Sequence, residues 1–313
     1  HWRKQNGPLH WDVEIPANTT ATLFMPDGTT RETGSGKYSF TQKLPTRDPH
    51  ILADEFLYTK ASFPECHSAT IAETKNGDLV ATYFGGTKER NPDVCIWVSR
   101  KPKGSSSWTL PQMVADGVMN DSVRKACWNP VVYQIPDGDL VIYFKIGNKV
   151  SDWTGWMVRS KDGGKTWSKR MPLQQDFLGP VKNKPVLSKG RLIAPTSIES
   201  DGWRLYFEYS DDMGKTWKRT PYVATDSIMQ DGKMRIKDLA IQPTIIFLSD
   251  GRLAALARTR SEHVAITYSS DNGETWTKLK LLSLPNNNSG LDAVTLNNGM
   301  HVMICNEKQH KQQ

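Results

Sequence analysis

A polar residue recurs at the same place in five successive segments of the chain, at the start of an apolar stretch. These residues are His67, Asn129, Asn183 with Lys184, Gln242 and Asp292. Amides, an ammonium group, a carboxyl and an imidazole can hydrogen-bond a ligand rich in hydroxyl groups, and His67 could transfer a proton near neutral pH. Five such positions favour a polar cleft for a ligand. A channel that is polar for structural reasons is the alternative.

Two arginines stand two positions apart in Arg258-Thr259-Arg260, at the end of a second apolar stretch. Residues two apart in a strand point to the same face. Two guanidinium groups on one face suit a carboxylate ligand, which arginine binds through paired hydrogen bonds. A salt-bridged pair with a purely structural role is the alternative interpretation. The equivalent position in an earlier segment holds Lys145, which should face the same cleft.

Residues 85–93 form a loop that carries two carboxyl groups, Glu89 and Asp93. A carboxyl can donate a proton to a leaving group near neutral pH if its surroundings raise its pKa. We therefore take Asp93, with Glu89 and His67, as the candidate catalytic residues. An aspartate that only caps a turn is the alternative for Asp93.

The elements that would position these side chains form a repeat. The pattern S-x-D-x-G-x-T-W occurs at residues 160–167, 210–217 and 269–276, and a degenerate copy occupies residues 99–108. Such a sequence suits a tight turn, because Ser and Asp cap backbone N–H groups and Gly accepts a positive φ angle. A repeated turn at regular spacing indicates a repeat architecture.

Each repeat contains four apolar stretches, which is typical of one blade of a β-propeller. Glycine turns separate the first two stretches of each repeat, at Gly77, Gly138, Gly190, Gly251 and Gly299. The fifth repeat has two apolar stretches and no copy of the S-x-D-x-G-x-T-W pattern. The sequence therefore predicts an all-β propeller whose first strands line a central channel, where the polar set would meet.

The pattern S-x-D-x-G-x-T-W, which we call the box, resembles the Asp box of the sialidase superfamily. Residues 62–306 are similar to bacterial sialidase-like BNR-repeat proteins. Trp128-Asn129-Pro130 and Gln242-Pro243-Thr244 are among the matching stretches. The resemblance implies a six-bladed propeller, incomplete here at the C-terminus, that removes a terminal acidic sugar such as sialic acid from glycans. It matches Asp93 to the acid of that family and the two arginines to its carboxylate ligands.

The sequence departs from that family at His67, where the family has the arginine of an Arg-Ile-Pro motif, and it lacks the blade that carries the family's tyrosine nucleophile. Related propellers use a channel histidine on rhamnose–glucuronate linkages. A His-dependent α-L-rhamnosidase, a rhamnose–glucuronate lyase and a non-catalytic glycan-binding propeller are therefore the alternatives to an exo-glycosidase.

The first 45 residues differ from the repeats. Strands are predicted over 10–15, 21–25 and 37–44, where hydrophobic residues alternate between turns. Residues 11–22 and 34–38 resemble the C-terminal β-sandwich of bacterial α-L-rhamnosidases. We therefore predict a rhamnosidase-like segment at 1–45, a linker at 46–64 and the propeller at 65–313.

Composition narrows the class of partner. The 313 residues carry a net charge of +7 and have a pI of about 9.1, which suits an acidic oligosaccharide or polysaccharide but also an ordinary basic surface. No nucleic-acid motif, membrane span, metal-site spacing or cofactor fingerprint is present, so none of these partners is expected. A secreted or periplasmic location is expected. The oligomeric state is not specified by the sequence.

The four cysteines, Cys66, Cys95, Cys127 and Cys305, lie in apolar contexts. Buried free thiols are predicted, with a disulfide between Cys66 and Cys127 as the alternative.

Overall fold

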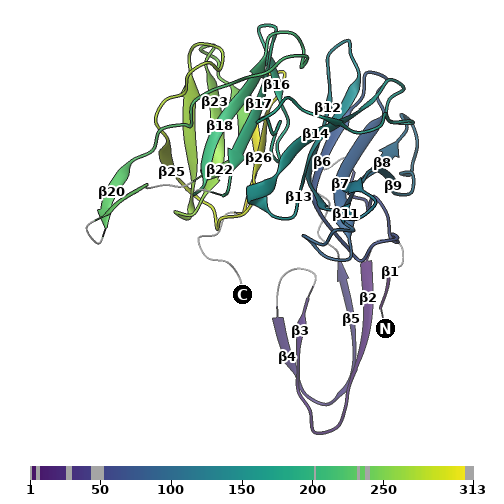
Figure 1. Ribbon diagram of the computed structural model, residues 1–313. Helices are drawn as coiled ribbons and strands as arrows, with labels where there is room; N and C mark the ends of the chain where they lie inside the picture. The colour runs from purple at the N-terminus through teal and green to yellow at the C-terminus, as the bar shows by residue number, and fades with distance from the viewer. Residues whose placement is uncertain are drawn as a thin grey trace. The chain divides into compact units, whose positions relative to one another are not determined.

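The computed structural model describes residues 2–4, 8–25, 30–43, 53–200, 202–230, 233–236 and 240–306. The chain divides into two compact units, His1–Phe56 and Leu57–Gln313. Regular structure is almost all β, with one short 3-10 helix, η1 (Val150–Asp152) (Figure 1). Over the described ranges, no helix has the length and apolar character that crossing a membrane requires.

The described residues of the N-terminal unit form two small antiparallel sheets. One has the order β1 (Trp2–Lys4), β2 (Pro8–Ile15), β5 (Gly36–Lys43), and the other pairs β3 (Ala21–Phe24) with β4 (Thr30–Thr33). The three predicted strands are present as β2, β3 and β5. The short strands β1 and β4 were missed, because their polar residues show no alternation.

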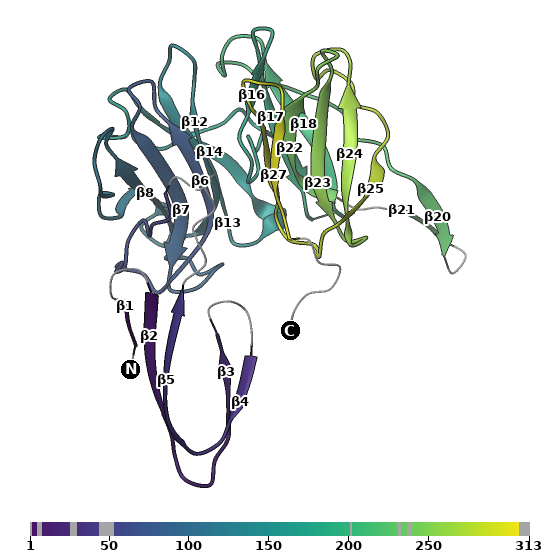
Figure 2. The same ribbon diagram turned by 180° about the vertical axis from the view of Figure 1, so that it is seen from behind.

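The larger unit contains four sheets of four antiparallel strands, each strand paired with the next in the chain (Figures 1 and 2). The strands of blade 1 are β6 (Glu65–Glu73), β7 (Leu79–Gly86), β8 (Cys95–Lys101) and β9 (Gln112–Ala115). Those of blade 2 are β12 (Ala126–Gln134), β13 (Leu140–Gly147), β14 (Thr154–Ser160) and β15 (Met171–Pro172).

Blades 3 and 4 follow the same order. Blade 3 has β16 (Val186–Ser188), β17 (Arg191–Ile198), β18 (Arg204–Ser210) and β19 (Lys218–Arg219). Blade 4 has β22 (Ala240–Phe247), β23 (Leu253–Thr259), β24 (His263–Ser269) and β25 (Lys280–Pro285).

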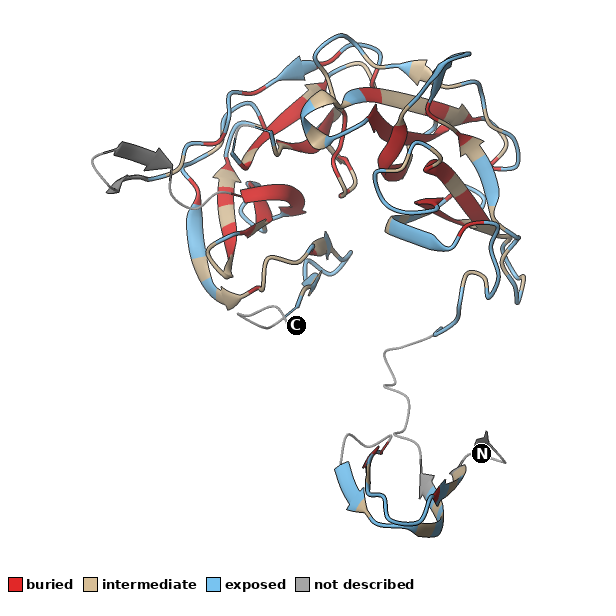
Figure 3. Ribbon diagram, turned by 60° about the horizontal axis from the view of Figure 1, so that its bottom comes forward, coloured by how far each residue is buried: buried red, intermediate tan, exposed pale blue. Residues whose placement is uncertain are grey.

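A fifth sheet pairs β26 (Asp292–Thr295) with β27 (His301–Ile304). The sheets follow one another along an arc (Figure 3), as predicted for an all-β propeller. The expected count of six blades is not confirmed, because the described residues form four complete blades and this two-stranded sheet.

Two hairpins interrupt the repeat, β10 (Val118–Asn120) with β11 (Val123–Arg124), and β20 (Ser227–Gln230) with β21 (Lys233–Ile236). Neither was predicted, because their strands are only two to four residues long.

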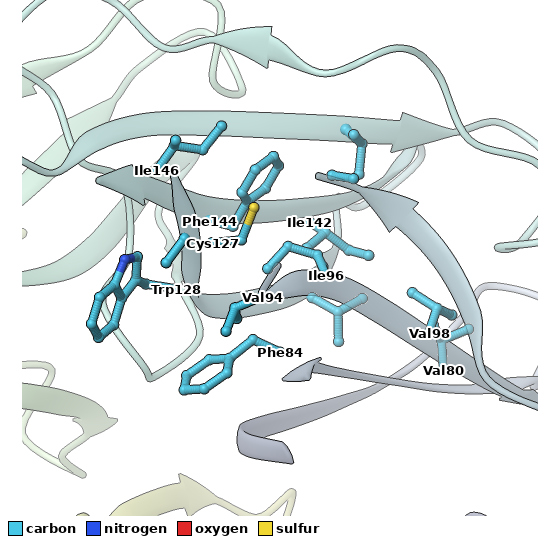
Figure 4. Close-up of a cluster of buried hydrophobic side chains, with 14 of the residues drawn as sticks. Val80, Phe84, Val94, Ile96, Val98, Cys127, Trp128, Ile142, Phe144 and Ile146 are labelled. Carbon is cyan, nitrogen blue, oxygen red and sulfur yellow. The ribbon is translucent and has the colours of Figure 1, made fainter. Parts of the chain in front are cut away.

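The core lies between neighbouring sheets. In Figure 4, Val80 and Phe84 of β7 face Ile142 and Phe144 of β13, with Ile96 of β8 among them, and all five are at most 2% exposed. The middle strands of a blade are covered on both faces, so their sequences are continuous apolar runs rather than alternating ones. Burial on this scale is what holds the first strands in place around the channel.

The predicted chemistry of the box is confirmed. In the first complete copy, Ser160 Oγ donates to Asp162 Oδ1 at 2.8 Å and accepts from the N–H of Gly164, also at 2.8 Å. Asp162 also accepts from the backbone N–H and the hydroxyl of Thr166, at 2.9 and 2.6 Å. Gly164 has a φ of 85°. The copies at residues 210–217 and 269–276 repeat this pattern.

The degenerate first copy uses a different carboxylate. Asp78, from the turn between β6 and β7, accepts from the N–H of Lys103 at 2.8 Å and from Arg100 Nη1 at 2.7 Å. A side chain from a neighbouring turn therefore stabilises the loop that lacks its own aspartate.

The segment predicted as a linker is only partly described. Residues 46–52 lie outside the described residues, and residues 53–64 contain no strand. Phe63 nevertheless belongs to the propeller, because its ring is 9% exposed and lies 4.7 Å from that of Trp97.

The four cysteines, all within the described residues, form no disulfide. Cys95 and Cys127 are buried as predicted, whereas Cys66 is exposed and Cys305 half-buried. The prediction was wrong for Cys66, because the first three residues of β6 are exposed.

Candidate functional site

The first strands of three blades carry a bulge at the same place. The ladder register shifts between His67 and Thr70 in β6, and equivalent shifts occur in β12 and β22. The bulged residues Ser68, Asn129 and Gln242 have φ angles of 56°, 40° and 56°. A bulge redirects side chains out of the regular alternation, and non-glycine residues with positive φ are often found at functional sites.

These bulges deliver side chains to one pocket, which we call the central pocket, with a volume of about 250 Å³. It is lined by His67, Ser68, Glu89, Arg90, Trp128, Asn129, Val150, Trp153, Lys182, Glu199, Gln242, Arg258 and Gly290. The structure therefore brings together five predicted site residues, namely His67, Glu89, Asn129, Gln242 and Arg258.

Arg258 provides the positive charge of the central pocket. Its Nη1 donates to Gln242 Oε1 at 3.3 Å, and its guanidinium carbon lies 5.1 Å from the centre of the Trp203 ring. Burial lowers the pKa of Arg258, but a guanidinium stays charged at any ordinary pH. No carboxylate of the described chain lies within ion-pair distance of it. A half-buried cation in this state can bind an anionic ligand.

Glu199 is a pocket residue that the sequence reasoning missed. It follows the last residue of β17, and burial raises its pKa above the usual range, against the opposing effect of Arg258 and Arg260. The carboxyl has no hydrogen bond or ion pair within the described part of the chain. Its position in the sequence could have indicated this role, because it directly follows the second strand of its blade, in the same region as Glu89 in blade 1.

His67 lies at the mouth of the pocket. Its side chain is exposed, and its ring packs edge-on against Phe84 with the ring centres 5.7 Å apart. It also borders an adjoining cavity of about 470 Å³ that includes Cys66, Glu89 and Val94. Its ring has no hydrogen-bond partner among the residues the structure describes, so both nitrogens can reach a ligand or water.

In blade 3 the residue that lines the central pocket is Lys182, which was not predicted, and not Asn183, which was. Asn183 is buried, and its Nδ2 donates to the carbonyls of Gln242 and Pro243 at 3.0 and 3.1 Å. It therefore fixes the bulge of β22 and does not reach the pocket. Lys182, with a φ of 73°, lines the pocket instead, and burial lowers its pKa.

Three other predicted binding residues lie outside the central pocket. Lys184 donates through Nζ to the carbonyl of Ile71 at 3.1 Å. Asp292 accepts from Thr244 Oγ1 and from the N–H of Ala293, both at 2.9 Å. Arg260 is exposed and stacks over Trp203 at 4.4 Å. None of these three residues belongs to the bulges of β6, β12 and β22, so an equivalent place in the repeat did not bring their side chains to the pocket.

Asp93, the candidate acid, also lies outside the central pocket. Its Oδ2 accepts from the N–H of Thr87 at 2.8 Å and from the Thr87 hydroxyl. These hydrogen bonds, the one from the Thr87 hydroxyl most of all, lower the pKa of Asp93. An aspartate held ionised in this way is a poor proton donor, so the structure favours the alternative of a turn cap.

Lys145 does not face the cleft either. It is fully buried at the interface of blades 2 and 3, where its Nζ donates to the carbonyl of Pro180. Burial lowers the pKa of this lysine to about 7. Within the described ranges, no group of three or more His, Cys, Asp or Glu side chains is arranged to hold a metal ion.

Comparison with known proteins agrees with the β-propeller fold. The family model described as the BNR repeat-like domain matches residues 77–313, and the model of the bacterial alpha-L-rhamnosidase C-terminal domain matches residues 1–40. The sialidase of Clostridium perfringens is 26% identical over 214 residues, covering 56% of each chain. The sialidase of Paraclostridium sordellii is 26% identical over 195 residues, 48% of this chain and 46% of that protein.

Solved structures show the same fold at lower identity. A structure of the NanB sialidase from Streptococcus pneumoniae superposes with a TM-score of 0.62 at 12% identity, covering 88% of this chain and 62% of that one. The chain spans about half the length of the curated relatives it matches. These likenesses identify a sialidase-like BNR propeller.

Proposed function

Because the chain belongs to the BNR repeat-like domain family, we propose that its propeller is a sialidase-like glycosidase that binds a terminal acidic sugar in the central pocket. The observation that carries this proposal is Arg258, whose charge has no carboxylate partner in the described chain and lies beside the amide of Gln242. A sugar carboxylate would supply that partner. Asn129 adds a donor for the sugar hydroxyls, and charged Lys182 keeps one N–H beyond those that donate to Asn183 Oδ1 and to the carbonyl of Leu291.

The pocket also holds the two kinds of group that glycoside hydrolysis needs. One group protonates the leaving oxygen, and another removes a proton from the attacking water, so that water adds across the broken bond. Glu199 suits the acid, because its raised pKa favours the protonated form. His67, exposed at the pocket mouth, suits the base.

The test is a substrate screen with the purified protein. Sialyllactose and rhamnose–glucuronate oligosaccharides are incubated with it, and the released sugars are separated by chromatography. Release of the terminal acidic sugar supports the proposal. Tight binding of these glycans without any turnover would overturn it in favour of a glycan-binding propeller.

A second candidate is a His-dependent α-L-rhamnosidase or rhamnose–glucuronate lyase. Two observations favour it: His67 lies in the pocket where the related sialidases are expected to have arginine, and residues 1–40 match a domain of bacterial alpha-L-rhamnosidases. Released rhamnose would select the rhamnosidase. An unsaturated uronate, seen as ultraviolet absorbance, would select the lyase. We further propose that residues 1–45 are the end of a rhamnosidase-like sandwich.

A further inference from the structure

A groove of about 800 Å³ lies between blades 2 and 3, and the mechanism proposed above does not use it. We call it the lateral groove. It continues from the central pocket, because Trp153 lines both and Ile198 of the groove precedes Glu199 of the pocket. Its far end reaches Pro172 in β15 and Arg219 in β19, the outermost strands of the two blades. The groove therefore leads from the central pocket to the outer edge of the propeller.

Aromatic side chains form much of its lining, namely Trp153, Trp156, Phe177 and Tyr206. The ring of Trp156 is held in one orientation, since its Nε1 donates to Thr154 Oγ1 at 2.8 Å and Arg170 lies 5.3 Å from the ring centre. Fixed aromatic rings beside a few polar groups are typical of ligand sites, and such rings bury the apolar face of a sugar well.

The floor of the groove is preformed. The segment after β15 is held by Glu208, a fully buried residue whose carboxylate accepts from the N–H groups of Leu178 and Gly179 at 3.0 and 2.8 Å. This segment passes close to Gly155, where a Cβ atom would lie 2.4 Å from the carbonyl oxygen of Phe177. A groove held in this way loses little entropy when a ligand binds.

The groove also has a positively charged side chain and a hydrogen-bond donor without a partner, both of which could bind a ligand. The guanidinium of Arg219 lies 4.1 Å from the Tyr206 ring centre and has no carboxylate partner among the described residues. At the junction with the central pocket, Trp153 Nε1 is buried without a hydrogen-bond partner in the described structure. Buried donors usually have a partner, and a ligand hydroxyl there would provide one.

We propose that the lateral groove binds the sugar residues that follow the terminal one in an acidic oligosaccharide. Trp156 would stack on one of them, and Arg219 would attract a second carboxylate along the chain. This proposal rests on the proposed function, because the terminal sugar must occupy the central pocket for the chain to continue into the groove.

The experiment compares short and long glycans by calorimetric titration. The probes are rhamnose–glucuronate oligosaccharides of two and six residues, and sialic acid against sialyllactose. The longer member of the pair that binds should bind about tenfold more tightly, the effect of about one aromatic stacking contact. Equal affinity for the short and long members would overturn the groove proposal.

Variants locate the effect. Trp156→Ala should abolish the gain for the long probe and leave the short probe unchanged, whereas Trp108→Ala, a half-buried indole on an outer turn of blade 1, should change neither. Trp156→Phe should keep part of the gain, and it serves as the test if the alanine variant does not fold.

Arg219→Ala should weaken binding of the acidic long probe about threefold, and more at low salt, because one exposed charge contributes little. Arg252→Ala, another arginine stacked on a tyrosine, should have no effect.

Failure of the two proposals gives different results. If Arg258→Ala loses binding but Trp156→Ala keeps the full gain for the long probe, the central pocket stands and the groove proposal is wrong. If the wild-type protein binds neither probe of either pair, the acidic-sugar function fails and the groove proposal fails with it.

Discussion

The outer turns and the channel ends of the blades are formed by the same strands but have different roles. At the outer turns, three copies of one sequence pattern give the same hydrogen bonds and the same positive φ at glycine. At the channel ends, equivalent positions hold different residues, and their side chains point in different directions. Repetition therefore specifies the scaffold, and the departures from repetition build the pocket.

Blade 3 shows how a departure works. In blades 2 and 4 the residue with positive φ directly precedes a proline, as in Asn129-Pro130 and Gln242-Pro243. In blade 3 the positive φ is at Lys182, three residues before Pro185. This shift places Lys182 in the central pocket and turns Asn183 into the interface with blade 4. This change in the backbone thus places an ammonium group in the central pocket, where blades 2 and 4 place an amide.

The largest effect is expected at the channel end. Arg258→Ala should lower kcat/KM at least about 30-fold, because removing one partner of a desolvated charge pair costs about 2–5 kcal/mol. Arg260→Ala, which removes the exposed arginine over Trp203, should change it by less than about threefold. Steady-state kinetics on the substrate found in the screen measures both. Equal effects of the two variants would mean that the pocket does not bind the carboxylate through Arg258.

Glu199→Gln should reduce kcat about 100-fold with little change in KM, since general acid catalysis contributes about 10²–10⁴-fold. The dependence of kcat on pH tests the same role of Glu199. The pKa of Glu199 is raised, so its proton is present at low pH and the activity falls as pH rises through that pKa. The variant should lose this alkaline limb. An unchanged profile would assign the acid role to another group.

Asp162→Ala should act on stability and not on activity. It removes hydrogen bonds to Ser160 and Thr166, which should lower the free energy of unfolding by about 2–3 kcal/mol. Thermal unfolding measures this, and Lys161→Ala, an exposed neighbour in the same turn, is the control. Activity at 25 °C should be retained.

The effect of Asp162 should also depend on pH. Hydrogen bonds, first of all from Thr166, lower the pKa of Asp162 in the folded protein. Its contribution is therefore fully present above the unfolded-state pKa of about 3.9 and is lost as pH falls toward the lower folded value. The difference in melting temperature between wild type and Asp162→Asn should shrink below about pH 4. A constant difference would mean that the carboxylate charge is not what stabilises the turn.

Only a small effect on activity is expected at Asp93. Asp93→Asn should keep kcat within about threefold of wild type, because the side chain lies outside the central pocket and is held by Thr87. The same kinetic assay as for Glu199→Gln measures it. A loss as large as that of Glu199→Gln would restore Asp93 as the proton donor.

The sequence by itself determined the local parts of this protein. The three boxes were predictable because the hydrogen bonds among their Ser, Asp, Gly and Thr residues lie within eight consecutive residues. The blade strands were predictable because glycine turns separate continuous apolar runs. His67, Asn129, Gln242 and Arg258 could be assigned to one pocket because the repeat places them at equivalent strand ends.

Only the tertiary structure decided the rest. The orientation of Asn183, the approach of Glu199 to Arg258 and the lateral groove depend on how one blade packs against the next. The residues involved are far apart in the chain, as Asn183 and Gln242 are, and no local pattern encodes their meeting. Bulges made the outcome harder to foresee, because one extra residue in a strand redirects the side chains that follow it.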